Sequence, residues 1–271
     1  MLPNFLVIGS SRSGTTSLYH HLGQHPQAYV TPVIEPRFFA FEDSALDFSG
    51  PGDQLLRHRV VTRWDDYVDL FTAARGQRAV GEVSPAYLCS AETARRIHRR
   101  VPAARILAIL RNPVERAISS FCLERLDGFE PEHSLRAAIG KEEARREANW
   151  SYVWRYHHRG RYHQHLRRYF DLFPKEQIGV WLYEDWEPDG GQTLLNAVFA
   201  FLGLDPDLGA TDEVVRLNTT GADRFRTCRL ERSEPSEEDL AWLTELYRDD
   251  IARLEELLCR DLSHWRRFGG S

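Results

Sequence analysis

The chain of 271 residues is 42% hydrophobic and 28% charged, and its formal net charge is −5 at pH 7. This length and composition are typical of a globular protein with a sizeable buried core, and we predict a single domain over 1–271 rather than two small ones. The negative charge argues against a general nucleic-acid binder, although local basic clefts for an anionic ligand are compatible with it.

The apolar segments are short and the cysteines are scattered. No run approaches the ~18 apolar residues of a membrane span, and the N-terminus lacks a basic secretory signal, so we predict a cytoplasmic protein without a membrane span. The four cysteines form no CxxC pair. They are therefore predicted to be reduced thiols, with neither a disulfide framework nor a zinc site.

The first distinctive stretch is an apolar run that leads into a small-residue turn. Residues 5–8 predict a strand buried on both faces of a parallel sheet. Gly14 can adopt positive φ, and residues 15–17 open an apolar-periodic segment, so the turn should feed a helix N-terminus. Backbone N–H groups, the helix dipole and three hydroxyls then converge, which predicts a bound phosphate or sulfate. A strand-to-helix turn without a ligand is the alternative.

This turn departs from the Walker pattern G-x-x-x-x-G-K-[ST]. Counted from Gly9, the pattern places Thr15 where the lysine should stand. The only two lysines are Lys141 and Lys175. Phosphate chemistry in the N-terminal half must therefore use arginine, which stays protonated and holds oxyanions in a bidentate manner.

Two further strands carry acidic residues near their ends. Residues 27–30 predict a second strand, and Glu35 follows it in a segment punctuated by prolines. Most glutamates in such a position are surface carboxylates in a turn, which is the first interpretation of Glu35. The second interpretation is that Glu35 lies at the edge of a binding site. Residues 79–83 predict a third strand, so Glu82 and Ser84 fall where ligands gather in α/β sheets.

A basic helix is predicted over 90–100. Its arginines are expected to form a solvated face. They are Arg95, Arg96, Arg99 and Arg100.

The next strand is predicted over 105–110, and its end suggests a second anion site. Arg111 follows this strand directly, and Pro113 favours a helix start there, which puts Ser119 about two turns into the helix. The alternative to an anion site is that Arg111 caps a loop and that Ser119 is a small residue that packs within the helix. Two anion sites at two strand ends fit a nucleotide with two separated phosphate groups better than they fit ATP.

The remaining chain adds a strand at 177–183 and helices over 192–202 and 236–259, without internal repeats. Alternating strands and helices predict an α/β fold with a central parallel sheet flanked by helices. A polar loop with two arginines lies at 218–226.

Taken together, the motifs resemble the sulfotransferase family that uses 3′-phosphoadenosine 5′-phosphosulfate (PAPS), particularly the heparan sulfate branch and its bacterial relatives. The resemblance covers most of residues 4–204, and it implies the P-loop-like sulfotransferase fold with PAPS as co-substrate and no metal. The matching pieces include GSSRSGTTSLYHHL, IEPRFF, GEVSPAYL, RILAILRNPVERAISSF and LLNAVFAFLGL.

The resemblance also implies roles for individual residues. Glu35 would be the general base, and Arg12 would stabilise charge on the departing 3′-phosphoadenosine 5′-phosphate. Arg111 and Ser119 would hold the 3′-phosphate, and Arg224 or Arg226 would reach a phosphate from a covering loop. The 5′-phosphosulfate would lie in the loop formed by Arg12, Ser13, Gly14, Thr15, Thr16 and Ser17.

Two positions depart from the pattern of this family. Many relatives carry lysine at the position of Arg12, and heparan sulfate enzymes often carry lysine at the position of Val83. The first change is tolerable because a phosphate leaving group needs no strong acid. The second counts against glycosaminoglycan recognition.

We therefore predict a sulfotransferase that moves a sulfuryl group from PAPS to a hydroxyl of a carbohydrate or small natural product. One alternative is a P-loop nucleotide kinase, which the missing lysine and the lack of an obvious Mg²⁺ carboxylate disfavour. The other is a catalytically inactive nucleotide-binding protein. The sequence leaves the acceptor and the oligomeric state open.

Overall fold

The computed structural model describes residues 1–186, 189–209 and 235–267 of the chain. Within them, the contacts divide the protein into two compact units. The described part of the first unit comprises 1–45, 59–111, 168–186 and 189–209, and that of the second comprises 46–58, 112–167 and 235–267. A single sulfotransferase domain over 1–271 stays a prediction.

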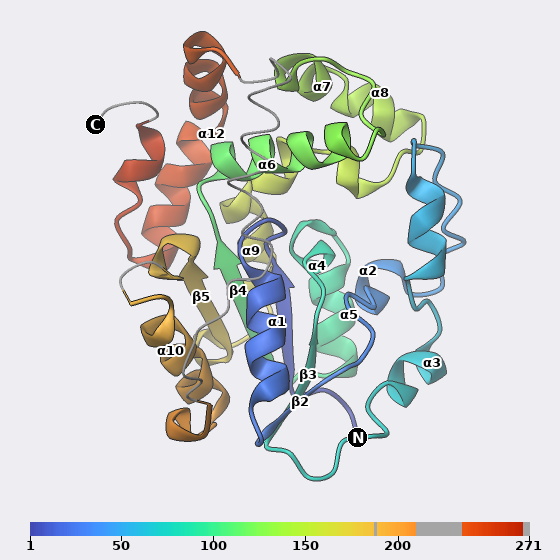
Figure 1. The fold of residues 1–271 in the computed structure, drawn as a ribbon, viewed down its shortest axis with the longest axis vertical. Helices are drawn as coiled ribbons and strands as arrows, with labels where there is room; N and C mark the ends of the chain where they lie inside the picture. The colour runs from blue at the N-terminus through green and yellow to red at the C-terminus, as the bar shows by residue number, and fades with distance from the viewer. Residues whose placement is uncertain (187–188, 210–234, 268–271) are drawn as a thin grey trace. The chain divides into compact units, whose positions relative to one another are not determined.

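The first unit is built on a five-stranded sheet with the order β2-β3-β1-β4-β5 (Figure 1). All four strand pairings are parallel. The predicted central parallel sheet is therefore confirmed, and the strand bounds differ from prediction by one residue at most. The strands are β1 (Phe5–Gly9), β2 (Ala28–Val30), β3 (Ala79–Val83), β4 (Arg105–Leu110) and β5 (Ile178–Leu182).

The α-helices occur in both units. None of those in the described part is long and apolar enough to cross a bilayer. In the first unit they are α1 (Thr15–Gln24), α2 (Phe38–Phe41), α3 (Trp64–Asp69), α4 (Ala86–Cys89), α5 (Thr93–Arg100) and α10 (Gln192–Leu202). In the second they are α6 (Pro113–Leu126), α7 (Leu135–Gly140), α8 (Glu142–Glu147) and α12 (Glu237–Leu258), while α9 (Tyr162–Phe170) has residues in both.

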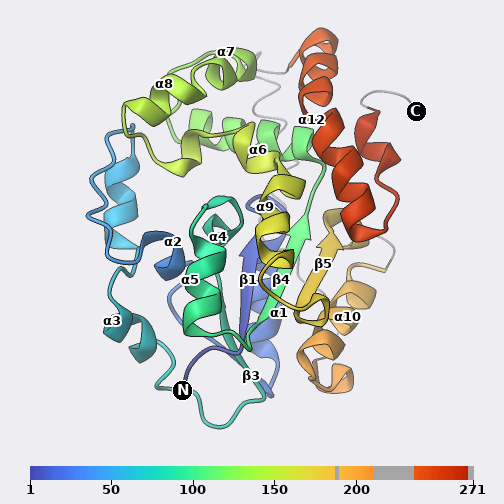
Figure 2. The ribbon, with the colours of Figure 1, turned by 180° about the vertical axis from the view of Figure 1, so that it is seen from behind.

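Both faces of the sheet are covered. Alternate strand residues such as Phe5, Val7 and Leu107 are fully buried in one cluster with the apolar sides of α1 and α10. Figure 1 shows these two helices on one face, and Figure 2 shows α4 and α5 on the other. Burial on both sides explains why the strands are continuous apolar runs instead of alternating ones.

The second unit has buried charges that are paired internally. The Arg145 guanidinium lies 2.6 Å from the carboxylate of Glu130 and stacks on the rings of Trp150 and Trp154. Asp53 accepts hydrogen bonds from the Ser151 hydroxyl and the Trp154 indole. These contacts satisfy groups whose burial without partners would be costly.

The cysteines only partly match the expectation of reduced thiols. Cys89 and Cys259 are thiols that take part in no disulfide bond. Cys122 is disulfide-bonded, which corrects the expectation at that position.

The carboxyl ends of three strands meet at one edge of the sheet. The backbone N–H of Ser84, just after β3, donates to the Val7 carbonyl of β1 at 2.9 Å. The N–H of Ser10, just after β1, donates to the Ile109 carbonyl of β4 at 2.7 Å. Any residue that directly follows β3, β1 or β4 is therefore held beside its counterparts at this edge.

The sheet core supplies the first prediction. Leu107→Ala in β4 should lower the free energy of unfolding by about 2–5 kcal/mol, because Leu107 is fully buried and its removal leaves a cavity. Leu208→Ala, at a half-exposed position in the same unit, should change it by less than about 0.5 kcal/mol. Urea unfolding measures both, and equal losses would contradict the assignment of Leu107 to the core.

Candidate active site

The loop after β1 has the geometry of an anion-binding turn. Gly14 adopts the left-handed conformation, with φ of 85°, and stands at the N-cap of α1 without a side-chain cap. The first N–H groups of an α-helix have no acceptor within the helix itself, so an uncapped start favours a bound anion. A Cβ atom on Gly14 would lie 2.9 Å from Nε1 of Trp186. Glycine is required here both by the backbone angle and by this indole.

The hydroxyls of this loop are largely withdrawn from solvent. Ser10 and Ser13 share a hydrogen bond of 2.6 Å between their Oγ atoms. Ser13, Thr15 and Ser17 are all buried. Arg12 is half-buried and has a positive φ of 69°, a conformation that costs a non-glycine residue roughly 1 kcal/mol or more. The loop therefore contains both buried hydroxyl groups and the permanent positive charge of Arg12.

Arg111 follows β4, the neighbour of β1 in the sheet. Its guanidinium stacks on the ring of Tyr183 at 4.8 Å from the ring centroid. Tyr183 comes directly after β5, which pairs with β4. The stack restrains the long arginine side chain and sets the plane of its guanidinium group.

Glu35 is held by its neighbour two residues along the chain. The guanidinium of Arg37 contacts the Glu35 carboxylate through both Nε, at 3.1 Å, and a terminal nitrogen. The Glu35 side chain is 27% exposed and that of Arg37 is 14% exposed. Both residues have positive φ on either side of Pro36. The carboxylate is thus restrained by an ion pair yet remains reachable from outside.

A buried carboxylate lies behind this pair. Glu82, in β3, is fully buried and accepts hydrogen bonds from the hydroxyls of Ser84, Tyr67 and Tyr87. Burial raises the pKa of Glu82 to about 7, although the three hydroxyls lower it. The Ser84 Oγ also accepts the backbone N–H of Arg37 at 2.9 Å. The end of β3 is therefore connected to the Glu35 segment.

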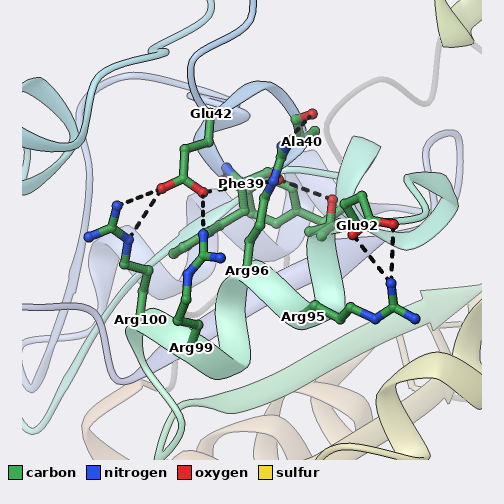
Figure 3. A network of polar contacts seen from close by, with 10 residues as sticks. Phe39, Ala40, Glu42, Glu92, Arg95, Arg96, Arg99 and Arg100 are labelled. Carbon is green, nitrogen blue, oxygen red and sulfur yellow. Dashed lines mark hydrogen bonds and ion pairs between the residues drawn. The ribbon is translucent and has the colours of Figure 1, made fainter.

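The chain beyond Glu35 is anchored by arginines of α5. Figure 3 shows the Glu42 carboxylate between Arg99 and Arg100, at 3.2 and 2.7 Å, while Arg96 reaches the carbonyls of Phe39 and Ala40. The solvated face predicted for α5 is therefore only partly correct. Arg96 and Arg100 are partly buried because α2 packs against this side of the helix.

The structure brings some of the predicted site residues together at one edge. The loop carrying Arg12 to Ser17 follows β1, and Arg111 follows the adjacent β4. Ser119 is buried in α6 and belongs to the second unit. Arg224 and Arg226 lie outside the described residues. No group of three or more His, Cys, Asp or Glu side chains that would suit a metal ion occurs in the described ranges.

Sequence reasoning missed two residues of this edge. Arg37 stands two residues after Glu35, and this short acid-to-base spacing was the available signal. Tyr183 is the last residue of the strand predicted over 177–183, but nothing local indicated that it would stack on Arg111.

The raised pKa of Glu82 supplies a second prediction. The folded protein keeps the proton up to about pH 7, whereas the unfolded chain loses it near 4.5, so this contribution to stability is full below 4.5 and is lost as pH rises through 7. Glu82→Gln removes the titration. The free energy of unfolding of the wild type minus that of the variant should fall by up to about 3 kcal/mol across this window.

Urea unfolding at several pH values measures this difference. Glu124 and Glu142 also have pKa values raised to about 7, mainly by burial, and they are common to both proteins. Their contributions therefore cancel in the subtraction. A difference that does not vary with pH would show that Glu82 does not titrate in this range.

Comparison with characterised sequences gives relatives that are much longer than this chain. It is 29% identical over 121 residues to the membrane-associated sulfotransferase kil1 of Dictyostelium discoideum, covering 44% of this chain and 22% of that protein. It is 26% identical over 275 aligned positions to the bifunctional heparan sulfate N-deacetylase/N-sulfotransferase 2 of Bos taurus, covering 96% of this chain and 30% of that protein. The chain thus spans less than a third of the length of either relative.

A solved structure matches the chain throughout. A sulfotransferase from Alicyclobacillus acidocaldarius is 36% identical, with a TM-score of 0.84 over 98% of this chain and 100% of that one. Residues 3–207 also match the profile described as the sulfotransferase family. On these matches, and with the parallel sheet and its phosphate-type loop, the chain belongs to the sulfotransferase family.

Proposed function

We propose that this protein is an enzyme that transfers a sulfuryl group from PAPS to an acceptor hydroxyl. The observation that carries the proposal is the pairing of two anion-type sites at adjacent strand ends. One is the uncapped start of α1 at Gly14, and the other is Arg111 stacked on Tyr183. PAPS carries a phosphosulfate and a separate phosphate, which suits two sites better than one.

The residues present fit such a donor. The loop of Arg12, Ser13, Gly14, Thr15, Thr16 and Ser17 would hold the 5′-phosphosulfate through backbone N–H groups and hydroxyls. Arg111 would hold the 3′-phosphate, to which the family resemblance adds Ser119 and either Arg224 or Arg226. PAPS supplies an activated sulfuryl group, so the protein's task is to orient the reactants and stabilise charge.

Glu35 is proposed as the general base. It would take the proton of the acceptor hydroxyl while that oxygen bonds to sulfur and the bond from sulfur to the bridging phosphate oxygen breaks. Its partial exposure suits contact with an acceptor from outside, and the ion pair with Arg37 fixes the direction of its carboxylate.

Arg12 is proposed to stabilise the negative charge that develops on the departing nucleotide. A guanidinium stays protonated throughout, so it acts through charge and hydrogen bonding and not as an acid. A phosphate leaving group is stable as an anion. Arginine can therefore serve where many relatives carry lysine.

The acceptor is proposed to be a carbohydrate or another small hydroxyl compound. The support is that a relative acting on heparan sulfate matches along 96% of this chain. Val83 counts against recognition of the same polymer, because a lysine found in many heparan sulfate enzymes is missing there. Cytoplasmic location remains part of the proposal.

Binding of the product nucleotide tests the donor site. Calorimetry should show 3′-phosphoadenosine 5′-phosphate binding without Mg²⁺, with Kd of about 10 μM or tighter, and much weaker binding of ATP. Arg111→Ala should weaken this binding by about tenfold or more, because a charge-assisted hydrogen bond to phosphate is lost.

Arg105→Ala is the matched control for this experiment. Arg105 begins β4 at the opposite edge of the sheet and also lies over an aromatic ring, that of Phe201. Its loss should change the affinity by less than about twofold. Preferential binding of Mg·ATP by the wild type would contradict the assignment of PAPS as the donor and would favour the kinase alternative.

Turnover of a Glu35 variant tests the base. With an acceptor found by screening carbohydrates and phenols against a labelled sulfate donor, Glu35→Gln should lower kcat by about 10²-fold or more and leave nucleotide affinity unchanged. Glu92→Gln, which alters another arginine-paired glutamate of the first unit, should change kcat by less than about twofold. Wild-type turnover in Glu35→Gln would remove Glu35 from the mechanism.

A further inference from the structure

The segment that carries Glu35 has a conformation that needs external support. Glu35 and Arg37 both have positive φ, at 56° and 55°, although neither is glycine. Pro36 stands between them and cannot donate a backbone hydrogen bond. Such conformations persist where the surrounding structure restrains them, so contacts to this segment are candidates for a role in the site.

One such contact reaches the segment from the end of β3. The Ser84 hydroxyl donates to Oε2 of Glu82 at 2.6 Å and accepts the backbone N–H of Arg37 at 2.9 Å. The Arg37 side chain then contacts the Glu35 carboxylate. Hydrogen bonds therefore link the buried strand to the backbone of Arg37, which is 47 positions away from Ser84 in the sequence, and the Arg37 side chain continues the connection to the proposed base.

We propose that Ser84, oriented by Glu82, is a positioning residue for Glu35 and acts through Arg37. This inference rests on the proposed function, because it assigns Glu35 as the base. Proton transfer depends on the placement of the base within hydrogen-bond reach of the acceptor hydroxyl. Ser84 fixes that placement without contacting the reacting atoms.

The direction of these hydrogen bonds explains why a carboxylate stands behind Ser84. Above its pKa of about 7, the Glu82 carboxylate is ionised and only accepts hydrogen bonds, so the Ser84 hydroxyl turns its hydrogen toward Glu82. A lone pair of the same oxygen then faces the Arg37 N–H. Tyr67 and Tyr87 donate to the other oxygen, Oε1, and so restrain the Glu82 carboxylate.

Two variants separate positioning from general packing. Ser84→Ala should lower kcat by about tenfold or more, with acceptor KM and nucleotide affinity within about twofold of the wild type. Tyr67→Phe is the matched control, because it also deletes one buried hydroxyl bonded to Glu82, but on the Oε1 side. It should change kcat by less than about threefold. Equal losses in the two variants would overturn the proposal.

A double-mutant cycle tests whether Ser84 acts through Arg37. In an Arg37→Ala background, Ser84→Ala should lower kcat by less than about threefold further, because the guanidinium that it positions is already absent. A full additional tenfold loss would show that Ser84 acts by another route.

Hydrogen exchange supplies a readout that does not depend on turnover. NMR should show that the backbone amide hydrogen of Arg37 exchanges about tenfold faster in Ser84→Ala than in the wild type. Its exchange rate should be unchanged in Tyr67→Phe. Unchanged exchange in Ser84→Ala would refute the positioning contact itself. Faster exchange together with an inactive wild type would instead retain the contact and refute the proposed function.

Discussion

The parallel pairing of β1 with β3 on one side and β4 on the other is the constraint on which the candidate site depends. Parallel strands end at the same edge, so residues that are far apart in the sequence become neighbours without any direct attraction between them. The loop after β1, Ser84 after β3 and Arg111 after β4 all owe their places to this register. The sheet therefore determines which residues are neighbours at this edge, and side-chain contacts then orient their functional groups.

The sequence was sufficient for the features that local chemistry determines. Continuous apolar runs indicated doubly covered strands, and the order of strand, small-residue turn and hydroxyls indicated the loop around Gly14. Asn112 caps α6 and Pro113 occupies its first turn, as the helix start at that proline had indicated. In each case the responsible residues lie within one or two turns of one another, so a linear pattern contains the information.

Contacts between distant segments could not be predicted in this way. The support of Arg37 by Ser84, the stacking of Arg111 on Tyr183 and the binding of Glu42 by α5 each join separate elements. No periodicity encodes such pairs, because they arise only after the strands have taken their register. The same limit explains why the arginines of α5 were expected to face solvent.

The use of arginine in place of lysine at the site has a practical consequence for handling the protein. Lys175 is the only lysine in the first unit, and it lies in the turn that precedes β5, at the sheet edge opposite Arg12 and Arg111. Amine-directed reagents, whether fluorescent labels or coupling to a surface, would find no lysine amine among the residues proposed to hold the donor. Reagents selective for guanidinium groups would instead meet the residues on which the donor site is proposed to depend.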